Sequence, residues 1–317
     1  MGLDVVVLFE HPEWQKPLWA ALEQRGVAFA AIDLKRAAFD PDAMPVAPLY
    51  FNQASPSAYV RGNTRAVPLA LSLMRSLEAG GARVLNGSRA FLLELSKSAQ
   101  AALLGRLGIA HPRSLAFNEP EVALEQWRGG WPALVKPEQG GSGARMFLLQ
   151  SPEELPRLLR EQPALWLPDN LLLLQEYFPV DAGKGIVRME FVGGKLLYAM
   201  RVISHGAFNL CPSEACNPEG GGDSHCAVPV PAAAPVKPVE FYPYPDVPAE
   251  AVADGERIMA AGGLDVGGIE YLEAADGRRI FYDINANSNL RAPIGQAFGF
   301  DPFSRVVDYL VEERRRL

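Results

Sequence analysis

The sequence predicts an α/β protein with an N-terminal lobe built on a parallel sheet and two further α+β lobes. Three observations support this prediction. Short apolar strands alternate with helices over residues 1–85, a glycine-rich turn joins two apolar strands within residues 131–149, and two acidic strands lie within residues 267–287. Strands separated by helices favour a parallel sheet with right-handed crossovers.

The N-terminal lobe is expected to contain four strands and two helices. The strands are predicted from short apolar runs and the helices from amphipathic spacing. The predicted strands cover residues 5–9, 27–32, 49–52 and 83–85, and the predicted helices cover residues 17–25 and 67–77.

The following helices are predicted from capping signals and apolar spacing. Ser88 is expected to cap a helix, because apolar residues recur at helical spacing from Phe91 to Leu107. Lys97 lies off that apolar stripe, so without further information it is a solvated surface residue. Ser151, followed by proline and a capping-box glutamate, predicts another helix start. Two more helices are predicted at residues 249–261 and from residue 301 onward.

The two acidic strands carry three oxygen-bearing side chains. Asp283 and Asn285 are two residues apart and therefore point to the same face of a strand. An Asp276-Gly277 hairpin turn can bring Glu270 alongside them. Two carboxylates and an amide oxygen suit Mg²⁺ held together with substrate phosphates. For this segment alone, a pair of strands with solvent-facing acids is the competing interpretation.

The glycine-rich turn follows an apolar strand that ends in Lys136. Gly140, Gly141, Ser142 and Gly143 make up a turn whose backbone N–H groups can close over an anion, while the lysine supplies a positive charge. No Gly-Lys-Ser/Thr motif opens a helix after the turn, so this is not a Walker motif. A glycine-rich hairpin alone is usually only a turn.

In this order, the segments from residue 86 to 310 resemble the ATP-grasp superfamily, and within it the ribosomal-protein S6 glutamate ligase and glutathione synthetase. The segment that ends at Lys97 resembles the one carrying the first nucleotide-binding lysine. Lys136 and its glycine-rich turn resemble the second lysine and the phosphate-covering loop. The apolar strand that leads to Gln175 and Glu176 resembles the hinge that holds the adenine. Glu270, Asp283 and Asn285 resemble the metal triad.

The resemblance implies roles for individual residues. ATP would be bound by Lys97, Lys136, Gly140, Gly141, Ser142, Gly143, Gln175, Glu176, Tyr177 and Phe178. Mg²⁺ or Mn²⁺ would be held by Glu270, Asp283 and Asn285. Arg201 and Arg188, on a predicted strand pair, would stabilise charge on the transferring phosphoryl group. The aspartate that relatives often have two residues before the first arginine is Ile186 here, so any role of that acid does not carry over.

The activity that the resemblance implies is an ATP-dependent carboxylate–amine ligase acting through an acylphosphate. An ATP-grasp kinase with a non-carboxylate acceptor and a nucleotide-binding regulator without turnover are the alternatives. Asn209, Asn289 and Arg291 are candidates for contacts with the substrate. The sequence does not identify the carboxylate or the amine, which could belong to small molecules or peptides, and it leaves open whether one or two metal ions bind.

Three domains are expected along the chain. They are an N-terminal α/β domain at residues 1–85, a central ATP-grasp lobe at residues 86–178, and a C-terminal lobe at residues 179–317 with a loop insertion at 210–248. The insertion is rich in Pro, Gly and Ala, and such loops are often lids, although an inconsequential insertion explains it equally well. Its three cysteines, Cys211, Cys216 and Cys226, match no metal-binding spacing, and their role stays open.

Composition and net charge limit the kinds of partner that the protein is expected to bind. A net charge of −7 over 317 residues gives no electrostatic support for a nucleic-acid surface. No apolar run reaches the roughly 18 residues that a membrane span needs. The N-terminus has no basic segment before its apolar run, so a cytoplasmic location is expected. The oligomeric state is left open, with a homo-oligomer as one option.

Overall fold

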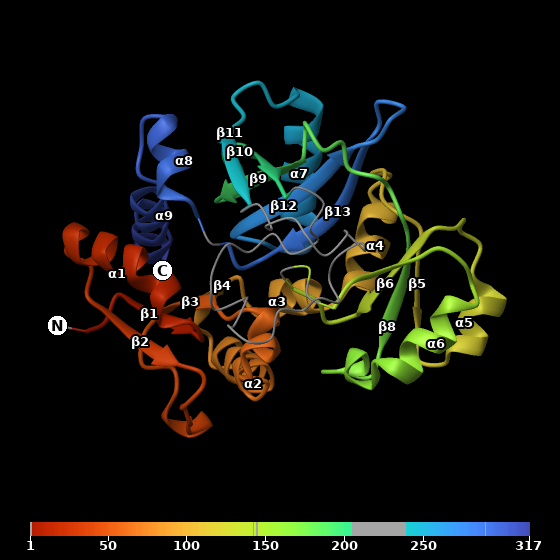
Figure 1. Ribbon diagram of the computed structural model, residues 1–317. Coiled ribbons are helices and arrows are strands. Elements are labelled where there is room, and N and C mark those ends of the chain that lie inside the picture. The colour runs from red at the N-terminus through yellow and green to blue at the C-terminus, as the bar shows by residue number, and fades with distance from the viewer. Residues whose placement is uncertain (1, 142, 144, 205–238, 289) are drawn as a thin grey trace.

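The computed structural model describes residues 2–141, 143, 145–204, 239–288 and 290–317. The described part of the chain contains three β-sheets, with helices packed against them (Figure 1). The N-terminal sheet has the order β2-β1-β3-β4, the central sheet β5-β8-β6-β7, and the C-terminal sheet β11-β10-β9-β12-β13. Figure 1 shows the N-terminal and central sheets on opposite sides, with the C-terminal sheet above them.

The N-terminal sheet is parallel throughout, as alternating strands and helices predict. Its first strand, Val-Val-Val-Leu-Phe, is buried along its whole length, because helices cover both faces of the sheet. The elements are β1 (Val5–Phe9), α1 (Pro12–Arg25), β2 (Phe29–Asp33), η1 (Pro41–Ala43), β3 (Leu49–Gln53), η2 (Pro56–Arg61), α2 (Ala66–Ala79) and β4 (Arg83–Leu85).

The central sheet is antiparallel, and its core gathers leucine, valine and aromatic side chains under two short helices. The predicted glycine-rich hairpin joins its strands β6 and β7. The elements are β5 (Ser114–Phe117), α5 (Pro120–Gln126), β6 (Ala133–Pro137), β7 (Phe147–Leu149), α6 (Glu154–Glu161), η3 (Pro163–Trp166) and β8 (Leu172–Glu176).

The C-terminal sheet is also antiparallel, with α7 against one face. The predicted Asp-Gly turn joins β12 to β13, and Gly277 adopts the positive φ of 84° that such a turn requires. The elements are β9 (Ile186–Val192), β10 (Lys195–Ile203), β11 (Glu240–Pro243), α7 (Ala249–Gly262), β12 (Val266–Glu273), β13 (Arg279–Asn285), α8 (Ala292–Ala297) and α9 (Pro302–Arg316).

The helical segment after residue 87 differs from the prediction. It forms two helices, α3 (Ser88–Leu95) and α4 (Lys97–Arg106), because Ser96 is extended and its side chain caps the second helix by accepting from Ala99 N at 3.1 Å. Ser88 is the first residue of α3, and Gly87 occupies the cap position. Side chains of both helices join the core of the C-terminal sheet. The division of the chain at residues 85 and 178 stays a prediction.

Two other boundaries are corrected. Helix α6 begins at Glu154 rather than at Ser151, because residues 151–153 form a turn before the helix. Residues 240–243 of the expected loop insertion form β11, which pairs with β10. Among the described helices, none combines the length and the apolar character that a membrane span requires. The expected cytoplasmic location stays a prediction.

Candidate functional site

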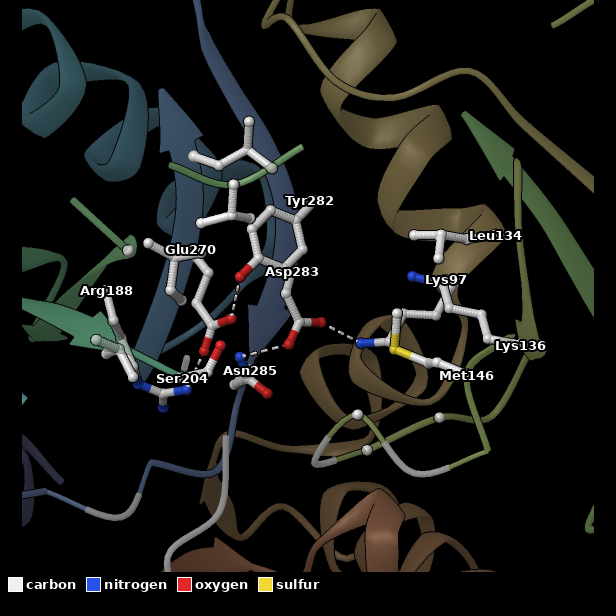
Figure 2. Close-up of a pocket in the computed structure, with 18 of the residues that line it drawn as sticks. Lys97, Leu134, Lys136, Met146, Arg188, Ser204, Glu270, Tyr282, Asp283 and Asn285 are labelled. Carbon is white, nitrogen blue, oxygen red and sulfur yellow. Dashed lines mark hydrogen bonds and ion pairs between the residues drawn. The ribbon is translucent and has the colours of Figure 1, made fainter. Parts of the chain in front are cut away.

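The three sheets surround a cavity of about 360 Å³. Of the predicted site residues within the described chain, all but Arg201 line it: Lys97, Lys136, Gly140, Gly141, Gly143, Gln175, Glu176, Tyr177, Phe178, Arg188, Glu270, Asp283, Asn285 and Arg291. Figure 2 shows the two lysines on one side of this cavity and Arg188, Glu270 and Asn285 on the other, with Asp283 reaching toward Lys97. Ser142, Asn209 and Asn289, together with the three cysteines, lie outside the described residues.

The acidic strands meet as the hairpin predicts. Glu270 of β12 lies directly opposite Asp283 of β13, and Gly268 lies opposite Asn285. The pairing then shifts by one residue, since Tyr271 pairs with Phe281. This bulge re-aims Tyr282 toward the cavity beside Asp283, where its hydroxyl donates to Glu270 at 2.9 Å.

Lys97 is the first residue of α4 and lies buried against the acidic strands. Its Nζ donates to Asp283, and it lies 3.4 Å from Gln100 Oε1. Burial is the largest single effect and raises the pKa of Asp283, but the charges of Lys97 and Lys136 and the hydrogen bonds from Lys97 and Asn285 together outweigh it, so the net shift is downward. Asp283 therefore stays ionised, although only about a quarter of its side chain is exposed (23%). The buried ion pair rules out the alternative that Lys97 is a solvated surface residue.

Lys136 is the penultimate residue of β6 and is 6% exposed. Its Nζ donates to Gln175 Oε1 at 2.9 Å, and Gln175 Nε2 in turn donates to Ser114 at 2.9 Å. Burial, followed by the charge of Lys97, lowers the pKa of Lys136 to about 8. Two lysines that repel each other in a buried cavity favour an anionic ligand between them.

The glycine-rich turn lies against the N-terminal lobe. A Cβ placed on Gly141 would come within 2.7 Å of Ser57 Cβ and 3.2 Å of its backbone. The neighbouring Gln139 donates from Nε2 to the carbonyl of Pro56 at 3.3 Å. The turn thus covers the cavity at the point where the central and N-terminal lobes meet, and it needs a residue without a side chain there.

We expect Gly141→Ala to weaken closure of the turn, because the added methyl would overlap Ser57. Overpacking of this kind costs about 1–3 kcal/mol, so the KM for ATP should rise at least about fivefold. Gly141 has no positive φ, so the effect would come from the contact and not from backbone strain. Gly130→Ala is the control, because its Cβ would meet nothing within 4 Å. Equal kinetics for the two variants would contradict the packing argument.

The predicted hinge begins with Gln175 and Glu176, the last two residues of β8, and continues with Tyr177 and Phe178. The backbone N–H of Glu176 donates to Arg113 O at 2.9 Å, and its carboxylate accepts from Arg113 N at 3.2 Å. Tyr177 and Phe178 follow outside the strand and line the cavity. Leu134, which lies opposite Gln175 across β6 and β8, and Met146 line the same cavity.

The two predicted arginines lie on opposite faces of the C-terminal sheet. Arg188 pairs with Met200 across β9 and β10, whereas Arg201 pairs with Val187. Because directly opposite residues share a face, Arg201 lies on the face away from the cavity. There it stacks 4.2 Å over the Tyr244 ring. The prediction that Arg201 stabilises the phosphoryl group is therefore corrected.

Arg188 occupies the cavity instead. Its Nη1 donates to Glu270 at 2.7 Å and its Nε to Glu190 at 2.6 Å. Burial alone would lower the pKa of Arg188, but the two carboxylates outweigh it and raise the pKa. Burial raises the pKa of Glu270, and Arg188 partly offsets that shift. The ion pair between the arginine and a candidate metal ligand favours the charged form of both groups and so opposes the effect of burial.

Sequence reasoning missed three buried acids around the cavity. Glu138 accepts from Ser98 N at 3.0 Å and so fastens the start of α4 to the end of β6, which fixes the two lysines relative to each other. Glu94 accepts from Asn287 N at 3.2 Å, and burial raises its pKa to about 8. Of the three acids, only Glu190 could have been found from the sequence. It lies two residues from Arg188, and residues two apart in a strand share a face.

Arg291 is the one substrate candidate that lies within the described residues, and it lines the cavity. Arg291 follows β13, and its guanidinium lies 3.3 Å from the centre of the Phe241 ring. Its backbone N–H donates to the Tyr198 hydroxyl at 2.8 Å. Trp14, Ser55 and Ser57 of the N-terminal lobe line the same cavity. Side chains of the N-terminal and C-terminal parts of the chain therefore line one cavity.

The donor set fits a hard divalent cation. Glu270 and Asp283 provide carboxylate oxygens from opposed positions, and Asn285, whose Nδ2 donates to Asp283 at 3.2 Å, has its amide oxygen left to offer. Among the described residues, no group of three or more Asp, Glu, His or Cys side chains could hold a metal. Mg²⁺ would thus depend on these three oxygens together with phosphate oxygens and water, as is usual for this ion.

The chain was compared with known proteins in sequence and in overall fold. No protein-family model matches the chain. A protein of Teredinibacter turnerae named probable alpha-L-glutamate ligase is 26% identical over 247 residues, which span 77% of this chain and 72% of the relative. A RimK domain protein ATP-grasp from Sphaerobacter thermophilus has a TM-score of 0.67 at 18% identity, covering 96% of this chain and 98% of that one. The ATP-grasp ligase PsnB, complexed with minimal precursor, Mg and ADP, has a TM-score of 0.65 at 18% identity over 99% of both chains.

Proposed function

We propose that this ATP-grasp protein is an ATP- and Mg²⁺-dependent ligase that joins a carboxylate to an amine through an acylphosphate. The observation that carries the proposal is the meeting, in one cavity, of two buried lysines with the opposed carboxylates Glu270 and Asp283. The ligase names of the relatives support the reaction class and do not favour the kinase alternative.

The two lysines would bind phosphate oxygens. Lys97 pairs with Asp283 in the structure, so phosphate and metal would replace the two halves of this ion pair. Lys136 would exchange Gln175 for a phosphate oxygen, and the turn at Gly140 and Gly141 would cover the phosphates with backbone N–H groups. The nucleotide base would lie in the cavity beside Leu134, Met146 and the hinge residues Tyr177 and Phe178.

The remaining charge would be handled by Arg188 and the acidic strands. Mg²⁺, when bound by Glu270, Asp283 and Asn285, would neutralise phosphate charge and orient the γ-phosphate. Arg188, 2.7 Å from Glu270, would stabilise negative charge on the transferring phosphoryl group. Arg291, at the substrate end, is the candidate for a carboxylate of the acceptor.

The reaction would proceed in two displacements. A carboxylate oxygen attacks the γ-phosphorus and ADP leaves. The amine nitrogen then attacks the acyl carbon, and phosphate departs with the original carboxylate oxygen. The cavity would position both partners rather than supply covalent chemistry.

The acylphosphate route is tested by following the oxygen of the substrate carboxylate. Carboxylates labelled with ¹⁸O are incubated with ATP, Mg²⁺ and a panel of amines, with L-glutamate first because the named relative is a glutamate ligase. We expect ADP, an amide of the matching mass, and ¹⁸O in the released phosphate. Phosphate retained on the acceptor would indicate a kinase, and AMP as the nucleotide product would refute the proposal.

A further inference from the structure

The least exposed charged side chain around the cavity is Glu190, at 0% exposure. It lies on β9 two residues beyond Arg188, on the same face of the sheet. A buried carboxylate is costly unless its oxygens are bonded, and both oxygens of Glu190 are. Oε1 accepts from Arg188 Nε at 2.6 Å, and Oε2 accepts from the Ser288 hydroxyl.

The register of β9 against β12 explains where the arginine lies. Arg188 lies opposite Glu270, and Glu190 lies opposite Gly268. The guanidinium lies over the glycine, since a Cβ on Gly268 would come within 2.4 Å of Arg188 Nη2 and 2.7 Å of Cζ. Any larger residue at position 268 would therefore push the guanidinium from its place.

Each of the three arginine nitrogens has a separate partner. Nε donates to Glu190, Nη1 donates to Glu270 at 2.7 Å, and Nη2 donates to Ser288 Oγ at 3.3 Å. Only the bond to Glu270 involves a candidate metal ligand. If the Glu270 carboxylate rotated to bind a metal ion, the hydrogen bonds to Glu190 and Ser288 would still hold the guanidinium.

We propose that Glu190, supported by Ser288 and Gly268, is a positioning residue that holds Arg188 by Nε and leaves Nη1 directed at the phosphoryl and metal site. This inference rests on the proposed function, because it assigns Arg188 to the transferring phosphoryl group. Glu190 also balances the charge of Arg188, which makes burial of the guanidinium less costly.

The test compares two nucleotide complexes by calorimetry. Glu190→Gln should bind Mg²⁺ with the ATP analogue AMPPNP within about threefold of the wild type, because Glu190 itself touches neither ligand. Mg²⁺·ADP with fluoroaluminate, which mimics the transferring phosphoryl group, should bind about 10–100-fold more weakly, the usual effect of removing an outer-shell partner. Ser288→Ala should show a smaller loss of the same kind, which keeps the test available if Glu190→Gln does not fold.

A double-mutant cycle separates positioning from a general structural role. In an Arg188→Lys background, Glu190→Gln should weaken the fluoroaluminate complex no further, because its effect passes through the guanidinium. Glu273→Gln is the matched control: Glu273 pairs with Arg201 at 3.2 Å on the other face of the sheet, and its loss should change neither complex.

Two results would overturn the inference. One is an equal loss of both nucleotide complexes in Glu190→Gln; the other is an additive loss in the Arg188→Lys background. These binding measurements need no acceptor. A wild-type protein that binds both complexes but forms no amide would therefore refute the ligase proposal without deciding this one.

Discussion

Asp283→Ala is expected to lower turnover by at least about 100-fold, the scale seen when a group that stabilises transition-state charge is removed. Asp283 is one of two carboxylates in the candidate metal site, and it is also the ion-pair partner of Lys97. Its loss would remove a metal ligand and leave a buried lysine without that counter-charge. The measurement is ADP release at several Mg²⁺ concentrations, with thermal unfolding to verify that the variant is folded.

Asp276→Ala is the matched control on the same hairpin. Asp276 lies at the turn, its side chain is half exposed, and it pairs with Arg278 at 2.7 Å away from the cavity. Its removal should leave ADP release within about twofold of the wild type, as for most surface substitutions. An Asp283→Ala variant that turns over like the control would show that the metal assignment is wrong.

Lys136→Gln is expected to weaken binding of Mg²⁺·AMPPNP by about 10–100-fold, because a hydrogen bond to a charged group contributes about 1.5–3 kcal/mol. Glutamine keeps a polar end that can still bond Gln175 but lacks the positive charge. Isothermal titration calorimetry at pH 7 measures the difference. Lys195→Gln is the control, since Lys195 is 79% exposed and pairs only with Glu256 at 3.2 Å.

The lowered pKa of Lys136, about 8, makes nucleotide affinity depend on pH. Lys136 is charged below that pKa and neutral above it, so wild-type affinity should fall as the pH rises through about 8, and binding there should take up a proton. The unfolded chain keeps its lysine proton to about pH 10.4. Between these values the unfolded state binds more protons, so this group makes the free energy of unfolding rise with pH.

Calorimetry in buffers of different ionisation enthalpy measures the proton uptake. The uptake near pH 8 should disappear in Lys136→Gln and persist in Lys195→Gln. The same slope of affinity against pH in the wild type and in Lys136→Gln would mean that another group titrates.

The resemblance to the ATP-grasp superfamily predicted the fold, which is confirmed, and local patterns predicted part of the cavity lining. Strand alternation and an Asp-Gly turn place Glu270 opposite Asp283, because both signals operate within one hairpin. The strand that ends in Lys136 and the glycines after it are likewise read from adjacent residues. Each of these features depends on contacts between neighbours in the sequence.

Which side chains face the cavity depends on the tertiary structure and cannot be read from local patterns. Arg188 and Arg201 sit on adjacent strands with similar surroundings in sequence, and only the register of β9 against β10 sends one into the cavity and the other to the opposite face. A shift of one residue reverses every side chain of a strand, and that shift is set by pairing between distant segments.

Burial was decided in the same way. Glu190 and Lys97 have the composition of surface residues, yet both are enclosed because strands and helices from different parts of the chain pack around them. The contact between Gly141 and Ser57 joins segments more than 80 residues apart. The sequence by itself therefore determined which residue types lie along each strand, turn and helix. The packing of the three lobes determined which of them face one another, because that choice is fixed by the summed burial of the whole core and not by any single segment.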